Sequence, residues 1–168
     1  MKTIYLAGGC FWGTQKFFDQ FEGVLETEVG YANGATDNPD YQAVCRGSGH
    51  AETVRVVFDE ARISLDKLLD YFFLAVDPLA VNKQGPDVGV QYRSGVYYTD
   101  PALLGALQAR FAREEAKYGQ KLATELLPLQ NFTSAEEYHQ KYLDKNPTGY
   151  CHLSKRLLNL NEEREQHA

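Results

Sequence analysis

Segments with the two-residue period of β-strands alternate with segments of helical period early in the chain, and this order restricts the folds open to it. Strands are expected at residues 3–7, 25–31, 51–59 and 95–99. Amphipathic helices are expected from about residue 11, where phenylalanines recur at helical spacing, and at residues 65–76. The resulting order, close to β-α-β-β-α-β, is typical of an α+β domain.

Capping signals place further helix boundaries. Ser64 precedes the stripe of leucines in the second helix and is expected to cap it. Asp100, followed by Pro101, is expected to open another helix, because proline suits the first helical turn. Residues 122–127 are one more candidate strand.

The last part of the chain carries weaker patterns. The tetrapeptide SAEE at residues 134–137 has the form of a capping box and predicts a helix bearing Tyr138 and Tyr142. A late leucine stripe predicts a last short helix. No linker or repeat divides the 168 residues, so we expect one domain over residues 1–168, with 152–168 as a partly helical or frayed C-terminal extension.

Charge and hydropathy exclude several classes of protein. The net charge of −6 does not suit a general nucleic-acid or anionic-membrane surface. No apolar run approaches the roughly 20 residues that span a bilayer, and the apolar stretch before Gly8 is too short for a signal peptide. We therefore expect a cytoplasmic protein that binds neither nucleic acid nor membrane.

The cysteines Cys10, Cys45 and Cys151 offer two interpretations. Their odd number, without an export signal, does not indicate a disulfide framework, and none lies in the CxxC spacing of a zinc site. They are either inert buried thiols or groups with redox chemistry.

Cys10 stands in the sequence GGCFWG, where a strand is expected to lead into a helix. The positive end of a helix stabilises a thiolate, so this position is expected to lower the pKa of Cys10. Gly8 and Gly9 would leave room for a substrate, and Phe11 and Trp12 could form an apolar wall. The alternative is a tight turn followed by two core aromatics.

Glu52 shares the strand parity of Val54, Val56 and Phe58, so it points to the most apolar face of its strand. Burial raises the pKa of a carboxyl group, and a protonated carboxyl can act as a general acid. The alternative is that Glu52, at the start of the strand, reaches solvent.

Other polar residues allow weaker hypotheses. His50 with Cys45 and Cys151 could form a zinc site, although their spacing does not support one. His139 and His152 are expected at the surface or with satisfied hydrogen bonds. Tyr41, Asp87 and Tyr92 lie in or beside polar loops and could supply hydroxyl donors and a carboxylate to a pocket. These candidate residues alone do not decide which reaction the protein catalyses.

Six motifs in this order resemble the class A peptide-methionine sulfoxide reductases over nearly the whole chain to residue 151. They are GGCFWG, VGYANG, NPDYQAVCRGSGHAETVRV, DVGVQYRSGVYY, EEYHQKYL and KNPTGYC. The resemblance implies a ferredoxin-like βαββαβ core with additional helices. It also implies reduction of methionine-S-sulfoxide, free and in proteins, as a repair of oxidative damage.

The resemblance further implies a role for each site residue. Cys10 is implied as the nucleophile, Glu52 as the acid that protonates the sulfoxide oxygen, and Cys151 as the resolving cysteine. Substrate-binding roles are implied for five residues: Phe11 and Trp12 against the methyl group, Tyr41 and Tyr92 on the oxygen, and Asp87 in the polar network. Cys45 matches a family cysteine that is not usually given a catalytic role.

The implied cycle passes through a Cys10 sulfenic acid and a Cys10–Cys151 disulfide, which thioredoxin or a similar dithiol reduces. No metal or organic cofactor is expected, and we expect a monomer. The chain departs from the family after Cys151, where many members have a glycine-rich tail, and at Pro86 and Val90. Another thiol-based redox enzyme, a cysteine hydrolase and a redox-sensing domain remain alternatives.

Overall fold

The computed structural model describes residues 1–160, and the expected fraying of the tail falls on residues 161–168, outside the described part. The strands differ widely in length. The strands are β1 (Lys2–Gly8), β2 (Val24–Ala32), β3 (Ala51–Phe58), β4 (Lys83–Gln84), β5 (Asp87–Val88), β6 (Ser94–Tyr98), β7 (Glu125–Pro128) and β8 (Phe132–Ser134).

The helices range from single turns to a helix of four turns. The α-helices are α1 (Phe11–Asp19), α2 (Tyr41–Cys45), α3 (Leu65–Ala75), α4 (Leu104–Tyr118), α5 (Tyr142–Lys145) and α6 (Lys155–Leu158). The 3₁₀ turns are η1 (Val90–Tyr92), η2 (Pro101–Leu103) and η3 (Glu137–His139). The four strands and two helices expected over residues 3–99 are thereby confirmed, with bounds that differ by one or two residues.

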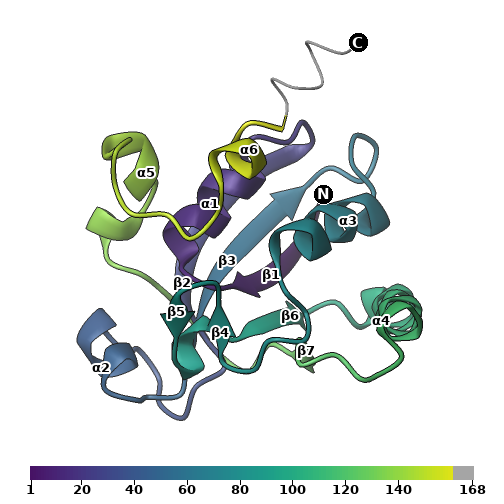
Figure 1. The fold of residues 1–168 in the computed structure, drawn as a ribbon, viewed down its shortest axis with the longest axis horizontal. Coiled ribbons are helices and arrows are strands. Elements are labelled where there is room, and N and C mark those ends of the chain that lie inside the picture. Colours follow the sequence, from purple (N-terminus) through teal and green to yellow (C-terminus); the bar gives the residue numbers. More distant parts are fainter. Residues whose placement is uncertain (161–168) are drawn as a thin grey trace.

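The described strands form a six-stranded mixed sheet in the order β7-β6-β1-β3-β2-β8 and a separate hairpin of β4 and β5. The pairs within β6-β1-β3-β2-β8 are antiparallel, whereas β6 and β7 are parallel. Helices α1 and α3 lie over one face of the sheet (Figure 1). Together they make one domain, in which β1 and β3 are central strands.

The main core lies between this face of the sheet and the two helices. Val54, Val56 and Phe58 point into it from β3, and Phe18 of α1 and Phe72 of α3 meet them from the other side. All five side chains are fully buried. Because strand side chains alternate between faces, the same parity carries Glu52 to the helix-covered side.

The cap of α3 is as expected, since Ser64 Oγ accepts a hydrogen bond from the backbone N–H of Lys67 at 3.1 Å. The expected helix from the box at residues 134–137 is wrong. Ser134 is instead the last residue of β8. The backbone N–H of the next residue, Ala135, still donates to the Val29 carbonyl oxygen of β2, so the chain stays extended there. Glu136 is also occupied elsewhere, because its carboxylate accepts from the Tyr31 hydroxyl at 2.8 Å.

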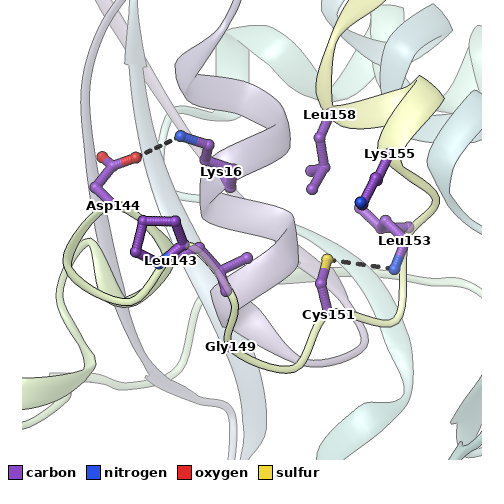
Figure 2. Close-up of a pocket in the computed structure, with 9 residues that line it drawn as sticks. Lys16, Leu143, Asp144, Gly149, Cys151, Leu153, Lys155 and Leu158 are labelled. Atoms are coloured by element: carbon purple, nitrogen blue, oxygen red, sulfur yellow. Dashed lines mark hydrogen bonds and ion pairs between the residues drawn. The ribbon is translucent and has the colours of Figure 1, made fainter.

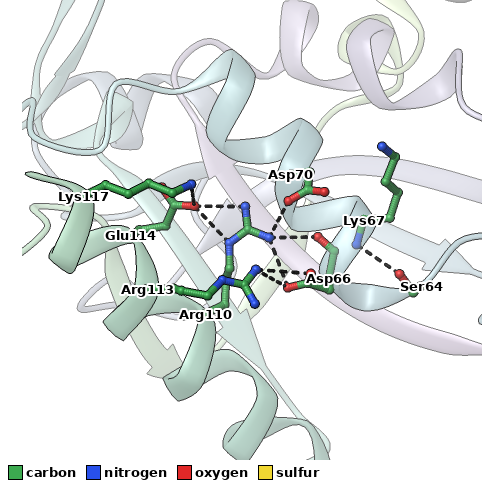
Figure 3. Close-up of polar contacts among 8 residues, drawn as sticks. All are labelled: Ser64, Asp66, Lys67, Asp70, Arg110, Arg113, Glu114 and Lys117. Atoms are coloured by element: carbon green, nitrogen blue, oxygen red, sulfur yellow. Dashed lines mark hydrogen bonds and ion pairs between the residues drawn. The ribbon is translucent and has the colours of Figure 1, made fainter.

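Helices α3 and α4 are joined by a cluster of charged side chains (Figure 3). Arg110 of α4 is almost fully buried and pairs with Asp66 and Asp70 of α3 and with Glu114 one turn further along α4. Arg113 adds an exposed contact to Asp66. Within residues 1–160, no helix combines the length and apolar character needed to cross a membrane.

Candidate active site

A cavity of about 220 Å³ opens where the β1–α1 junction, α2, β3, the β5–η1 segment and the loop before Cys151 meet. Its lining residues are Cys10, Phe11, Trp12, Tyr41, Glu52, Asp87, Tyr92 and Tyr150. Seven of these are candidates of the sequence analysis, and Tyr150 is the one that it missed. Cys151 does not line this cavity.

Cys10 occupies the N-cap position of α1, and only 8% of its surface is exposed. The expected lowering of its pKa is wrong. Burial raises the pKa of the Cys10 thiol, and the nearby carboxylate of Glu52 raises it further. The backbone N–H groups of Trp12 and Gly13 act in the opposite direction but are weaker. The charge of Asp87 raises it as well, so protonation of Glu52 removes one of three causes.

Glu52 lies on β3 beside the first turn of α1 and is 2% exposed. Its Oε1 accepts a hydrogen bond from the backbone N–H of Phe11 at 3.2 Å. Burial raises the pKa of Glu52 to about 8, although the Phe11 N–H favours the charged form. The carboxyl group is therefore mostly protonated at neutral pH, as its parity on the strand predicts. The alternative in which Glu52 reaches solvent is wrong.

Tyr41 and Tyr92 bring phenolic groups to the cavity from separate short elements. Tyr41 begins α2, and its backbone N–H donates to Glu136 Oε2 at 3.1 Å. Tyr92 ends η1. Burial is the main cause that raises the pKa of both phenols, so both hydroxyl groups remain hydrogen-bond donors throughout the neutral range.

Phe11 and Trp12 form the apolar part of the cavity, and other aromatics hold them in place. The Trp12 ring stacks on Tyr142 with ring centroids 3.7 Å apart. The Trp12 Nε1–H donates to His139 Nδ1 at 2.9 Å. His139 also packs against Phe11 and is only 1% exposed, so the first of its two expected settings, the surface, is wrong. The second, satisfied hydrogen bonds, holds for Nδ1 but not for Nε2, which is buried without a hydrogen-bond partner among residues 1–160. EEYHQKYL, which contains both supporting residues, was the signal that could have identified them.

Asp87 and Tyr150 meet at the edge of the cavity. The Tyr150 hydroxyl donates to Asp87 Oδ1 at 2.7 Å. Asp87 Oδ2 is buried and has no hydrogen-bond partner among residues 1–160. The cavity therefore contains an acceptor that a bound molecule could use.

The three cysteines occupy different environments, and all are free thiols. Cys45 is exposed at the end of α2. Cys151 is half-buried and lines a second cavity of about 490 Å³ together with residues of α1, α5 and α6 (Figure 2). Its Sγ accepts a hydrogen bond from the backbone N–H of Leu153 at 3.4 Å.

The glycines before Cys10 do not leave space for a substrate, contrary to expectation. A Cβ atom on Gly8 would lie 2.9 Å from a methyl group of Val76, and one on Gly9 would lie 2.8 Å from Cβ of Gln84. Gly9 also has a φ of +91°, which favours glycine. These positions are glycine because neighbouring segments pack closely on the turn.

The zinc alternative lacks its ligand cluster. The described part of the chain contains no group of three or more His, Cys, Asp or Glu side chains placed to hold a metal ion. His50 Nδ1 instead lies 2.8 Å from Ser48 Oγ.

Comparisons with known proteins agree with this geometry. The family model "Peptide methionine sulfoxide reductase" matches residues 2–168. A peptide methionine sulfoxide reductase MsrA of Clostridium acetobutylicum is 52% identical over 159 residues, which are 94% of this chain and 98% of the relative. The chain therefore belongs to the peptide methionine sulfoxide reductase family, and it is an enzyme that reduces methionine sulfoxide.

Solved structures give the same relationship. Reduced Mxr1 from Saccharomyces cerevisiae matches with a TM-score of 0.83 and 42% identity, covering 89% of this chain and 88% of that one. Mxr1 in complex with Trx2 matches with a TM-score of 0.57 and 29% identity, covering 84% of each chain.

Proposed function

We propose that this chain reduces methionine-S-sulfoxide, free and in proteins, through a Cys10 sulfenic acid and a Cys10–Cys151 disulfide that thioredoxin reduces. The observation that carries the proposal is a single cavity in which a buried thiol faces a carboxyl group that is protonated at neutral pH. Apolar rings and two phenols complete its lining. The sulfoxide has matching parts: a sulfur, a basic oxygen and a methyl group.

In the bound substrate, the methyl group lies against Phe11 and Trp12, and the oxygen accepts from Tyr41, Tyr92 and Glu52. The support is the position of the apolar rings and the polar donors in the lining of one cavity. Asp87 completes the polar network, in keeping with its unpartnered buried oxygen. A fixed arrangement of this kind accepts one epimer, because exchanging oxygen and lone pair on sulfur would turn the oxygen away from its donors.

Proton transfer from Glu52 makes the sulfoxide oxygen a better leaving group while the Cys10 sulfur attacks the sulfoxide sulfur. The oxygen is transferred to Cys10, which becomes a sulfenic acid, and methionine leaves with its sulfur reduced by two electrons. The thiol proton of Cys10 returns the carboxyl group to its protonated form. No step calls for a metal or an organic cofactor.

Cys151 then attacks the sulfenic sulfur, and a Cys10–Cys151 disulfide forms with loss of water. Thioredoxin or a similar dithiol reduces this disulfide by exchange. Support for a reductant of this kind comes from the structural relative Mxr1, which has been solved in complex with Trx2. We propose a cytoplasmic location, because the cycle requires reduced thiols, and a monomer as the working unit.

We also propose the finer description of the core as ferredoxin-like, with residues 1–168 as one domain and 152–168 as its C-terminal extension. The support is the strand order β6-β1-β3-β2, with α1 between β1 and β2 and α3 between β3 and β6.

The test is a substrate panel with dithiothreitol as reductant. We expect many turnovers with the S epimer of free and peptide-bound methionine sulfoxide, and none with the R epimer. Consumption of hydrogen peroxide without reduction of the S epimer would instead identify a thiol peroxidase. Reduction of at most one equivalent of sulfoxide would point to a sensing domain.

A further inference from the structure

Residues 151–153 pack against Gly9 and Gly13 of the GGCFWG motif, and we call this contact site the seat. A Cβ atom on Gly13 would lie 2.7 Å from Cys151 Sγ and 3.1 Å from His152 Nδ1. A Cβ atom on Gly9 would lie 2.9 Å from His152 Nε2. Side chains at these positions would therefore displace the segment that carries Cys151.

His152 supplies the polar contact that holds this segment. Its Nε2 lies 2.9 Å from the carbonyl oxygen of Gly8. A carbonyl oxygen only accepts, so Nε2 carries the hydrogen of this bond. Burial lowers the pKa of His152, which leaves the ring neutral near pH 7. Nδ1 is buried without a hydrogen-bond partner within the described residues, so the Gly8 bond is the polar contact of the ring.

The seat lies one helical turn from Cys10. Cys10 is the N-cap of α1, and Gly13 follows three residues later. Three residues are just under one turn of an α-helix, so a group held over Gly13 lies about one turn from Cys10. The N–H of Leu153, which donates to Cys151 Sγ at 3.4 Å, restrains the thiol there.

We propose that His152 is a positioning residue for the resolving step, because its hydrogen bond to Gly8 keeps Cys151 over Gly13, about one helical turn from Cys10. This inference rests on the proposed resolving role of Cys151. In that step the Cys151 sulfur attacks the Cys10 sulfur, an S–S bond forms and the S–O bond of the sulfenic acid breaks. The hydroxyl leaves with the thiol proton as water. His152 takes no part in the bond changes. It raises their rate because it restrains Cys151 and so reduces the entropy lost when the two sulfur atoms come together.

The experiment compares His152→Leu with His152→Gln. Leucine retains bulk but removes the donor, whereas the glutamine amide nitrogen can occupy the place of Nε2 and donate to Gly8. Each protein is mixed with free methionine-S-sulfoxide without reductant, quenched with acid at intervals, and analysed by mass spectrometry. We expect disulfide formation to be about 10-fold slower in His152→Leu, and largely restored in His152→Gln. The first equivalent of methionine forms at the wild-type rate in both.

Gly13→Ala tests the seat from its other side. Alanine favours the helix more than glycine does, so a slower resolving step in this variant is not a result of a weaker α1. The matched control is Gly105→Ala in α4, where a Cβ atom would meet nothing within 4 Å. We expect slower disulfide formation and a longer-lived, dimedone-reactive sulfenic acid in Gly13→Ala, and wild-type kinetics in the control.

Wild-type disulfide kinetics in His152→Leu would overturn the proposal. Disulfide formation that is slow in His152→Leu and stays slow in His152→Gln would also overturn it, because loss of the hydrogen bond would then not explain the slow step. A failure of the proposed function gives a different result. In that case Cys151→Ser would still close a disulfide at Cys10 after one turnover, whatever residue stands at position 152.

Discussion

Burial of Glu52 has opposite consequences for catalysis and for stability. The carboxyl group lies on the apolar face of β3 with one backbone N–H as its partner. Its pKa of about 8 makes it a proton donor at neutral pH. The same burial makes its ionisation unfavourable in the native state, whereas the unfolded chain ionises it freely.

For catalysis, we expect Glu52→Gln to retain more activity than Glu52→Ala. The glutamine amide can still donate a hydrogen bond to the sulfoxide oxygen, although it has no acidic proton. Loss of a general acid typically lowers the rate about 10²- to 10⁴-fold, and alanine should lie at the upper end of that range. Single-turnover formation of methionine at pH 7 measures both variants. Equal losses would argue against the donor role.

For stability, we expect the advantage of Glu52→Gln to grow with pH. Below the usual carboxyl pKa of 4.5 the group is protonated in both states and has no effect. Between 4.5 and about 8 only the unfolded chain releases the proton, so the free energy of unfolding of the wild type falls. The variant should gain roughly 5 kcal/mol above pH 8 relative to its advantage at low pH. Urea unfolding of both proteins at pH 5 and pH 8.5 tests this, and a pH-independent difference would contradict it.

His139 acts on the apolar part of the cavity by holding the Trp12 indole. We expect His139→Leu to raise the KM for methionine sulfoxide about fivefold, since it removes one hydrogen bond worth about 1 kcal/mol, with a smaller effect on kcat. Steady-state kinetics with dithiothreitol measure both constants. The exposed neighbour provides the control, because Tyr138→Leu should change neither constant. An unchanged KM in His139→Leu would show that the indole needs no such support.

Among the elements, the charged cluster between α3 and α4 contains one buried ion pair, Arg110 with Glu114. We expect Arg110→Leu to destabilise the protein by about 3 kcal/mol or more, because Glu114 stays buried without its main partner. Arg113→Ala removes an exposed contact of the same cluster and should cost less than about 1 kcal/mol. Urea unfolding compares the two variants. Similar losses would show that burial does not set the strength of these pairs.

The elements that the sequence predicted well are those with a long periodic pattern. β3 and α3 have clear stripes, and the parity of β3 alone placed Glu52 on the buried face. The failures depend on distant partners. The SAEE box gave no helix because the Ala135 backbone pairs with Val29, and the side chain of Glu136 bonds Tyr31. The sequence of residues 134–137 gives no sign of either contact.

For the site, the residue motifs predicted the lining of the cavity but not the parts that support it. His139 and Tyr142 lie in short turns, and both contact Trp12, which is far from them in the sequence; His139 is buried there and Tyr142 is half-buried. The pKa of Cys10 was predicted in the wrong direction, because a helix N-terminus is visible in the sequence whereas burial and the nearness of Glu52 are not. Roles assigned to these residues stay predictions.

At the scale of the whole molecule, the fold brings two thiols far apart in the sequence to the same end of α1. Cys10 is the N-cap of α1, and the C-terminal segment packs against the first turn of this helix, so that Cys151 lies over Gly13. Cys45, although nearer to Cys10 in sequence, is exposed at the end of α2. The proposed cycle therefore uses Cys151 as the partner of Cys10 and does not involve Cys45.

The most direct test is a mass-spectrometric disulfide map of the protein after one equivalent of methionine-S-sulfoxide, with free thiols alkylated before digestion. The proposed cycle predicts one equivalent of methionine, a peptide pair joined through Cys10 and Cys151, and an alkylated Cys45. A disulfide that includes Cys45, or methionine formed while Cys10 remains an alkylated thiol, would contradict it.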